Sequence, residues 1–354
     1  VKLLLEAYPG LPVVITTTTP TGSERVKKLF GDSVLHVYAP YDLPIALNAF
    51  IRRARPRLLV MMETEIWPNM LAVCNKRGIP TILANARLSE RSAARYAQWP
   101  RFTRLMFNSI GHVAAQGDAD AARFIRLGVA PDRISVIGSV KFDSRLPASL
   151  FESAEVLRRA WGGRPVWVAA STQEGEDEQI LRAHRLIIKS IPDALLVLVP
   201  RHPERFDRVY ALCQREGFHC VRRSSGDPCG AEMELFLGDT MGELSLFLAA
   251  AEAAFVGGSL IKRGGQNVLE PAALGKPVAF GPHMYNFAAI SELLLERDAA
   301  RVVNDAQELA EVIQHWLADA SERARVGENG RRVVEENQGA VDRLFYLIEQ
   351  QLAG

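Results

Sequence analysis

The segment from Phe255 to Pro282, FVGGSLIKRGGQNVLEPAALGKPVAFGP, shows how this chain is built. It begins as an apolar strand pattern, enters a loop at Gly257-Gly258, continues into a helical pattern near Asn267 and ends in a second apolar strand pattern at 278–280. A strand, a crossover helix and a second strand form a unit whose two strands are parallel. We therefore expect an α/β fold in which helices cover both faces of a parallel sheet.

The same alternation extends over the rest of the chain. Apolar strand patterns occur at 13–18, 58–62, 81–84, 112–115 and 135–137, and again at 166–170, 195–199, 235–237, 254–256, 278–280 and 300–303. The segment 138–151, GSVKFDSRLPASLF, interrupts the series and is expected to be a linker.

Two doubly wound halves joined by a linker predict a GT-B architecture, with two Rossmann-like domains that face each other across a cleft. We expect an N-terminal domain at 1–140, a linker at 141–151, a second domain at 152–335 and a C-terminal helix at 336–354. The sequence opens on a helical pattern, VKLLLEAYPG, whereas a doubly wound domain opens on a strand. The first domain is therefore expected to be incomplete at its start.

The composition is that of a globular protein, with 48% hydrophobic and 23% charged residues in 354. Its longest apolar runs fall far below the roughly 18 residues of a membrane span. Residues 50–110 hold ten arginines and one lysine against three glutamates, whereas the whole chain has a net charge of +1. This asymmetry favours an anionic partner such as phosphate or an acidic membrane surface, with a solvated arginine-rich face as the alternative. Aromatic residues do not interleave with the arginines, so no nucleic acid is expected.

Polar or glycine-rich segments follow five strand patterns of the second half, at 171–175, 200–205, 238–243, 257–259 and 281–283. Because the carboxyl ends of parallel strands meet at one edge, these segments predict a crevice for a phosphorylated ligand beside helix N-termini. Within it, Glu270 is expected to accept the hydroxyls of a ribose. The alternative is a capping box in which Asn267 caps the helix and Glu270 supports it.

Other nucleotide motifs are missing: the sequence has no P-loop and no Gly-x-Gly-x-x-Gly turn. Asp118 and Asp120 match the Asp-x-Asp pattern of metal-dependent glycosyltransferases. They open a helical pattern, however, where acidic residues interact favourably with the helix dipole. We prefer that interpretation and expect no metal site.

In the first half, Glu63 and Glu65 follow the strand pattern 58–62, and strand alternation would place them on one side. Two carboxylates there are costly unless they bind something, and the alternative is that they cap the helix beginning at Pro68. Arg87, Arg91 and Arg95 recur at four-residue spacing, which predicts one helical face. That face would contact anionic lipid headgroups or simply be solvated.

Nine segments together resemble one family. In order they are TPTGSERV, VYAPYDLP, METEIWPN, ANARLSERSA, GSVKFD, VPRHPERF, GDTMGEL, FVGGSLIKRGGQNVLEP and ENQGA, between Thr19 and Ala340. The chain resembles the bacterial 3-deoxy-D-manno-octulosonic acid (Kdo) transferases of lipopolysaccharide biosynthesis. The resemblance implies a metal-independent, inverting GT-B enzyme without a cofactor. Its N-terminal domain would bind the acceptor, the lipid A precursor lipid IVA, and its second domain the donor, CMP-Kdo. It also implies peripheral contact with the anionic cytoplasmic face of the inner membrane.

The resemblance further implies roles for individual residues. Those that correspond to CMP contacts are Pro200, Arg201, Met241, Gly242, Glu243, Asn267, Val268, Leu269 and Glu270. Glu63 and Lys141 correspond to residues that stabilise the transition state. A carboxylate favours the positive charge that develops on the sugar as CMP departs, and a lysine favours carboxylate or phosphate oxygens. From the residues alone, Lys141 could equally be a surface charge.

The sequence departs from the family pattern in three places. The family's general base, a glutamate in a Ser-x-Gly-Glu motif, is absent and is expected upstream of Val1 together with a membrane anchor. Gln173 and Gln266 stand where histidine is common. We therefore expect this chain to bind cytidine nucleotide but to transfer little or no sugar. The alternatives are another GT-B enzyme that uses a UDP- or GDP-sugar, or a non-catalytic protein that binds membranes or anions.

Overall fold

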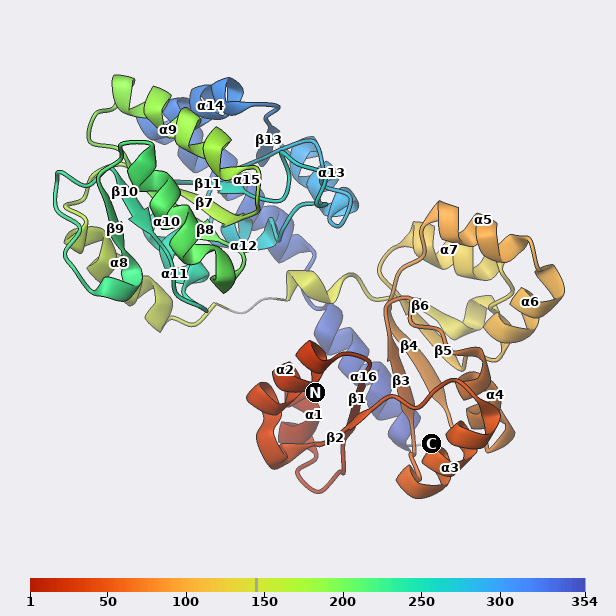
Figure 1. Cartoon of the computed structure of the whole chain (residues 1–354). Helices are drawn as coiled ribbons and strands as arrows, with labels where there is room; N and C mark the ends of the chain where they lie inside the picture. The colour runs from red at the N-terminus through yellow and green to blue at the C-terminus, as the bar shows by residue number, and fades with distance from the viewer. Residues whose placement is uncertain (144–145, 354) are drawn as a thin grey trace. The chain divides into compact units, whose positions relative to one another are not determined.

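The computed structural model describes residues 1–143 and 146–353. The chain folds into two compact units, the first made of Val1–Asp143 with Gln338–Gly354 and the second of Ser144–Asn337 (Figure 1). The expected linker 141–151 includes residues 144 and 145, which lie outside the described residues. At its two ends, Val140–Phe142 form a 3-10 turn and helix α8, Ser149–Ala160, begins.

The second unit is built on one sheet of seven strands in the order β13-β12-β11-β7-β8-β10-β9. Every pair of neighbours is parallel. The strands are β7 Val166–Thr172, β8 Leu195–Pro200, β9 Cys220–Arg222, β10 Leu235–Leu237, β11 Ala253–Val256, β12 Val278–Phe280 and β13 Ala300–Val302. The expected parallel sheet is confirmed. The edge strand β9 was not expected, because its sequence, Cys-Val-Arg, ends in a charged residue and only Val221 is buried.

Side chains of β7 alternate between two cores. Trp167 and Ala169 pack with helices α9 Asp177–Ser190, α10 Phe206–Arg215 and α14 Ala306–Ala318, whereas Val166 and Val168 pack with α8 and α11 Leu244–Ala250. Helices therefore cover both faces of the sheet, as expected for a strand whose first five residues, 166–170, are all apolar. The remaining helices of this unit are α12 Leu269–Ala273, α13 Ala288–Glu296 and α15 Ala320–Glu336.

The first unit holds a four-stranded parallel sheet, β3-β4-β5-β6, and a separate parallel pair, β1-β2. The strands are β1 Val14–Thr17, β2 Leu35–Tyr38, β3 Leu59–Met62, β4 Thr81–Ala86, β5 His112–Ala115 and β6 Ile134–Val136. Strand β2 was not expected from the sequence. The helices are α1 Lys2–Ala7, α2 Pro20–Phe30, α3 Pro44–Ala54, α4 Pro68–Lys76, α5 Glu90–Ala97, α6 Pro100–Asn108 and α7 Asp118–Arg126. In the described part of the chain, no helix combines the length and the apolar character needed to cross a membrane.

The C-terminal helix α16, Ala340–Ala353, packs on the first unit. Its Leu347 and Ile348 join Ile82, Ala84 and Ala114 in one buried cluster. The chain just before this helix is fastened by the Asp143 carboxylate, whose two oxygens accept the backbone N–H groups of residues 339 and 341, each at 2.6 Å. The last residues of the chain thus complete the core of the first unit.

Candidate functional site

The loops after β7, β8, β11 and β12, at the carboxyl edge of the seven-stranded sheet, are joined to one another by hydrogen bonds. The loop after β11 folds back on its own start, with the Gly265 N–H donating to the Gly258 carbonyl at 2.8 Å and the Gln266 N–H to the Gly257 carbonyl at 3.1 Å. The loop after β12 joins it through the His283 N–H and the Ser259 carbonyl, at 3.0 Å. Loops that follow different strands therefore form one connected layer.

Glu176 organises this layer, although the sequence analysis did not select it. One carboxylate oxygen accepts the N–H groups of Ser259 and Leu260, both at 2.9 Å, and the other those of Gly258 at 2.6 Å and Gln173 at 3.0 Å. Glu176 is fully buried, so these bonds replace the water that the carboxylate loses. No local spacing could reveal the residue, because its partners after β11 lie more than 80 positions away.

Ser259 makes the next connection. Its Oγ donates to the Val256 carbonyl at 2.5 Å and accepts the Gly281 N–H at 2.8 Å, which ties the loop after β11 to the end of β12. A Cβ atom on Gly281 would lie 2.3 Å from the Ser259 carbonyl oxygen. Glycine is therefore required at position 281 by the close approach of two backbones.

Arg201 follows β8 and is exposed beside the same layer. Its N–H donates to the Thr172 carbonyl at 3.0 Å, and its Nε lies 3.3 Å from Gln266 Oε1. The structure thus brings Arg201 next to the loop that carries Asn267. Pro200, the last residue of β8, is buried.

Arg205 of the same motif has a different role. It forms an ion pair with the buried Asp177, which also accepts the Thr172 hydroxyl at 2.8 Å. Burial raises the pKa of Asp177 even though the Arg205 charge opposes the change. This pair lies below the loops and fixes the end of β7 to α9.

Helix α12 begins at Leu269, two residues later than the sequence predicted. Asn267 Oδ1 accepts the Leu269 N–H at 3.1 Å, and Asn267 Nδ2 donates to Glu270 Oε1 at 3.1 Å. The two side chains therefore interact directly at the helix start. Val268 and Leu269 have 0% and 2% exposure, so their side chains belong to the core.

Met241, Gly242 and Glu243 connect β10 to α11. Glu243 accepts two hydrogen bonds from the Arg223 guanidinium, at 2.8 Å from Nη2 and 3.0 Å from Nε. The pKa of Glu243 is lowered mainly by its hydrogen bonds from Arg223. A hydrogen bond from the Thr240 hydroxyl lowers this pKa further. Met241 is 63% exposed, which is high for a large apolar side chain.

In the first unit, Glu63 lies in a turn rather than in a strand. Strand β3 ends at Met62, and Glu63 adopts a left-handed backbone with φ +55° while its N–H donates to the Ala84 carbonyl at 2.8 Å. The expectation that strand alternation places Glu63 and Glu65 on one side was therefore wrong.

The capping role considered for Glu63 and Glu65 belongs to Asp42. Its carboxylate accepts the Asn69 N–H at 3.1 Å and the Met70 N–H at 3.0 Å in the first turn of α4. The sequence did not indicate this contact, because Asp42 lies 27 residues before Asn69.

Lys141 lies in the 3-10 turn Val140–Phe142, after the last strand of the four-stranded sheet. The Val140 N–H donates to Asn85 Oδ1 at 3.2 Å. Glu63 and this turn are therefore bonded to consecutive residues of β4, Ala84 and Asn85. The structure brings the two predicted catalytic residues to the same edge of one sheet.

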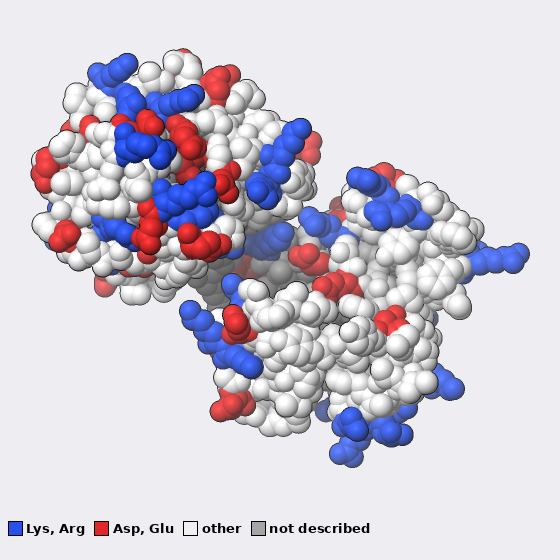
Figure 2. Space-filling model, in the orientation of Figure 1, with Lys and Arg blue, Asp and Glu red and all other residues white. Residues whose placement is uncertain are grey.

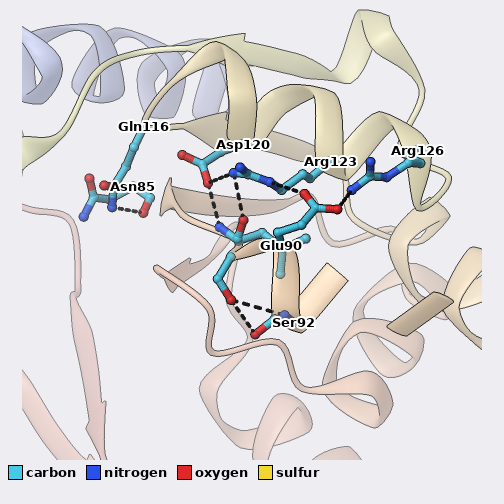
Figure 3. A network of polar contacts seen from close by, with 9 residues as sticks. Asn85, Glu90, Ser92, Gln116, Asp120, Arg123 and Arg126 are labelled. Atoms are coloured by element: carbon cyan, nitrogen blue, oxygen red, sulfur yellow. Dashed lines mark hydrogen bonds and ion pairs between the residues drawn. The ribbon is translucent and has the colours of Figure 1, made fainter. Parts of the chain in front are cut away.

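Asp118 and Asp120 occupy the first turn of α7, so their interpretation as helix-start acids is confirmed. Asp120 accepts the Leu88 N–H at 2.8 Å and pairs with Arg123, which in turn binds Glu90 (Figure 3). Over residues 1–143 and 146–353, no group of three or more His, Cys, Asp or Glu side chains is placed to hold a metal ion.

The arginine face predicted at positions 87, 91 and 95 is smaller than expected. Arg87 precedes α5, so only Arg91 and Arg95 share that helix. Residues of the following segment add exposed apolar side chains, with Trp99 at 72% and Leu105 at 75% exposure. On the visible face of the first unit, uncharged side chains cover most of the surface (Figure 2).

Comparison with known proteins identifies the fold and then the family. HepE from Anabaena, solved in complex with UDP, is 14% identical with a TM-score of 0.61 over 99% of this chain and 94% of that one. Two Rossmann-like units of this kind define the GT-B class of glycosyltransferase folds, as the sequence predicted. A family model described as "3-Deoxy-D-manno-octulosonic-acid transferase (kdotransferase)" matches residues 1–144. The 3-deoxy-D-manno-octulosonic acid transferase of Haemophilus influenzae is 43% identical over 99% of this chain and 83% of its own length. The chain belongs to this transferase family.

Two further relatives agree with this assignment. The 3-deoxy-D-manno-octulosonic acid transferase of Bordetella pertussis is 38% identical over 99% of this chain and 83% of its own length. The C-terminal CMP-Kdo binding domain of WaaA from Acinetobacter baumannii is 34% identical, with a TM-score of 0.51, over 53% of this chain and 99% of that domain. The family resemblance stated from the sequence motifs is confirmed.

Proposed function

We propose that this chain transfers Kdo from CMP-Kdo to the lipid A precursor, lipid IVA, in lipopolysaccharide biosynthesis. One observation carries the proposal: the loops after β7, β8, β11 and β12 form a single layer, held by Glu176 and Ser259, in which Arg201 contacts Gln266 and Glu270 contacts Asn267. The family model occupies residues 1–144. We therefore take the second unit as the counterpart of the CMP-Kdo binding domain of WaaA.

The donor site would use the nine residues named from the sequence. Arg201 supplies an exposed positive charge for the phosphate, and Glu270 at the start of α12 supplies a carboxylate for the ribose hydroxyls. Met241, Gly242 and Glu243 would border the same nucleotide from the loop after β10. The proposed reaction includes no cofactor, and CMP-Kdo enters it as the donor substrate.

Glu63 and Lys141 would act at the transferred sugar. The bond between Kdo and the CMP phosphate breaks with its electron pair on the phosphate, and an acceptor oxygen forms the new bond while its proton passes to the family's general-base glutamate, which is not among residues 1–354. Positive charge develops on the sugar as the first bond breaks, which Glu63 would stabilise. Lys141 would stabilise the negative oxygens of the donor.

The acceptor and the membrane would meet the first unit on the α5–α6 surface, which combines cationic and apolar side chains. Arg101 and Arg104 line a hollow of about 460 Å³ together with Pro100, Leu105 and Asn108. Basic and exposed apolar residues side by side suit a phosphorylated, acylated lipid in an anionic bilayer. We place this contact at the cytoplasmic face of the inner membrane, as a peripheral one.

Calorimetric titration tests the donor site. CMP should bind more tightly than UDP, and Arg201→Ala and Glu270→Ala should each weaken CMP binding by about tenfold, the loss of a hydrogen bond to a charged group. Arg208→Ala is the matched control, since Arg208 is 73% exposed and pairs with Glu174 at the surface. Tighter binding of UDP, or no binding of CMP to folded protein, would overturn the donor assignment. Mass spectrometry of lipid IVA incubated with CMP-Kdo and the protein tests the transfer itself.

A further inference from the structure

Asn85 has an unusual backbone for a buried residue of a strand. It is 1% exposed and lies near the end of β4 with φ +51°, where the pairing of β4 with β5 shifts register between Leu83 and Ala86. Among residues other than glycine, asparagine tolerates this left-handed conformation best. Strained positions and bulges of this kind concentrate beside functional sites.

The bulge turns Asn85 so that it bonds to two neighbouring loops. Its Oδ1 accepts the Val140 N–H at 3.2 Å, and its carbonyl accepts Gln116 Nε2 at 2.9 Å (Figure 3). Gln116 directly follows β5, and its own N–H donates to the Ala86 carbonyl at 2.9 Å. The segment that carries Lys141 is thus attached to the strand by one side chain.

Glu63 is bonded to the neighbouring residue of β4. Its N–H donates to the carbonyl of Ala84, the residue before Asn85. Hydrogen bonds to two consecutive residues of β4, Ala84 and Asn85, therefore connect Glu63 and the Lys141 turn.

We propose that Asn85 is a positioning residue for Kdo transfer, which fixes the Lys141 turn relative to Glu63. The inference rests on the proposed function, since it assumes that Glu63 and Lys141 act at the transferred sugar. Without the Asn85–Val140 bond, the turn would keep its fold but sample a wider range of positions. A displacement of about 1 Å in a catalytic group can reduce a rate by up to roughly 100-fold.

Three variants remove or keep this bond. Asn85→Gly keeps a left-handed backbone without strain but removes the acceptor. Val140→Pro removes the donor; Ser139 before it is extended (φ −95°, ψ 127°) and Val140 opens the 3-10 turn, so proline fits there. Asn85→Asp keeps an acceptor oxygen at the same place. Arg55→Gly is the matched control, because Arg55 also has a left-handed backbone, φ +45°, at the exposed end of α3.

Steady-state kinetics of Kdo transfer decides the proposal, measured on protein that carries the family's general-base glutamate, since residues 1–354 lack its Ser-x-Gly-Glu motif. Asn85→Gly and Val140→Pro should each lower kcat by about 10- to 100-fold with KM for CMP-Kdo changed less than about threefold. The double variant should lose no more than either single variant, since both remove one bond. Asn85→Asp should retain most of the rate and Arg55→Gly all of it.

Three results would overturn the proposal: kcat of Asn85→Gly within about twofold of the parent, multiplied losses in the double variant, or an equal loss in Arg55→Gly. Lys141→Ala separates this failure from failure of the proposed function. If the parent protein transfers Kdo and Lys141→Ala is slow while Asn85→Gly is fast, only the role of Asn85 is wrong. If Lys141→Ala is as fast as the parent, the assigned role of Lys141 is wrong, and the inference falls with it.

Discussion

Glu176 and Ser259 lie 83 residues apart in the sequence, yet the Ser259 N–H donates to Glu176 Oε1 at 2.9 Å inside the second unit. The carboxylate of Glu176 joins the loop after β7 to the loop after β11. The Ser259 hydroxyl joins that second loop to the end of β12 by accepting the Gly281 N–H. The shape of the proposed nucleotide site therefore depends on one buried acid that would not touch the nucleotide.

Replacing that acid tests its role. Glu176→Gln exchanges one acceptor oxygen for an NH₂ group that faces backbone donors, so the variant should lose about 2–4 kcal/mol of unfolding free energy. CMP affinity should fall by about tenfold or more, because the loop after β11 loses its anchor. Urea unfolding and calorimetric titration measure the two effects.

Glu174→Gln is the control for this prediction. Glu174 lies two positions earlier, its side chain is 60% exposed, and it pairs with Arg208 at the surface. Its replacement should change stability by less than about 1 kcal/mol. A Glu176→Gln variant with the CMP affinity of the parent would contradict the anchoring role.

Gly281 offers an independent test of the same layer. In Gly281→Ala the new methyl group would meet Ser259 backbone atoms at 2.3 and 2.4 Å, so the β12 end must move. We expect a loss of about 1–3 kcal/mol in unfolding free energy, together with weaker CMP binding. Gly330→Ala in α15 is the matched control, because its methyl group would make an ordinary 3.4 Å contact with Ala272. That variant should be neutral or more stable, since alanine favours a helix over glycine; equal effects at both positions would refute the steric argument.

Asp143→Ala should loosen the C-terminal helix from the first unit. The substitution leaves the N–H groups of Gly339 and Val341 without their acceptor, at a cost of about 1–3 kcal/mol. Amide hydrogen exchange should accelerate in α16, while CMP affinity stays unchanged because the donor loops belong to the other unit. Asp32→Ala, at an exposed site, should leave the exchange of α16 as in the parent. Unchanged exchange in Asp143→Ala would show that apolar packing alone holds the helix.

His184 predicts a pH dependence of stability. Burial lowers its pKa from 6.5 to about 4, opposed by the hydrogen bond between its ring and the Glu234 carbonyl at 2.8 Å. Between those two values the unfolded chain binds a proton that the folded chain does not. The unfolding free energy should therefore fall as the pH decreases from about 6.5 towards 4, by up to about 3 kcal/mol from this residue.

The His184→Gln variant should lose that part of the dependence. Urea unfolding at several pH values between about 4.5 and 7.5 should give a flatter profile for the variant than for the parent. His219→Gln is the control, since His219 is exposed in the same unit and should leave the profile unchanged. Equal slopes for the parent and His184→Gln would contradict the prediction.

Much of the fold could be predicted from the sequence. A strand that is buried on both faces appears as a short run of apolar residues between helical patterns, and such a run can be recognised locally. The segments at 195–200 and 81–86 are buried at every position, which is why continuous apolar runs located them. Strands β2 and β9 had no such signal, since β2 has no buried residue and β9 has only one, Val221.

The candidate donor site was located in a similar way and stays a prediction. Arg201, Glu243 and Glu270 were selected because they lie in segments that follow strands, and strand ends are local properties. The supporting residues Asp42, Asn85, Asp143 and Glu176 were not selected, because each acts through a hydrogen bond to a residue at least 27 positions away or across a loop. Local spacing carries no information about such partners until the fold is known.

The return of α16 to the first unit has a consequence for the order of events during synthesis. Leu347 and Ile348 belong to the same buried cluster as Ile82 and Ala114, so a core begun early in translation is closed by residues that are synthesised only after the whole second unit. Until then, the apolar face that α16 covers is open while the intervening unit can already fold. Nascent chains stalled before residue 340 should therefore be the species that chaperones hold, and synthesis of α16 should be the step that frees them.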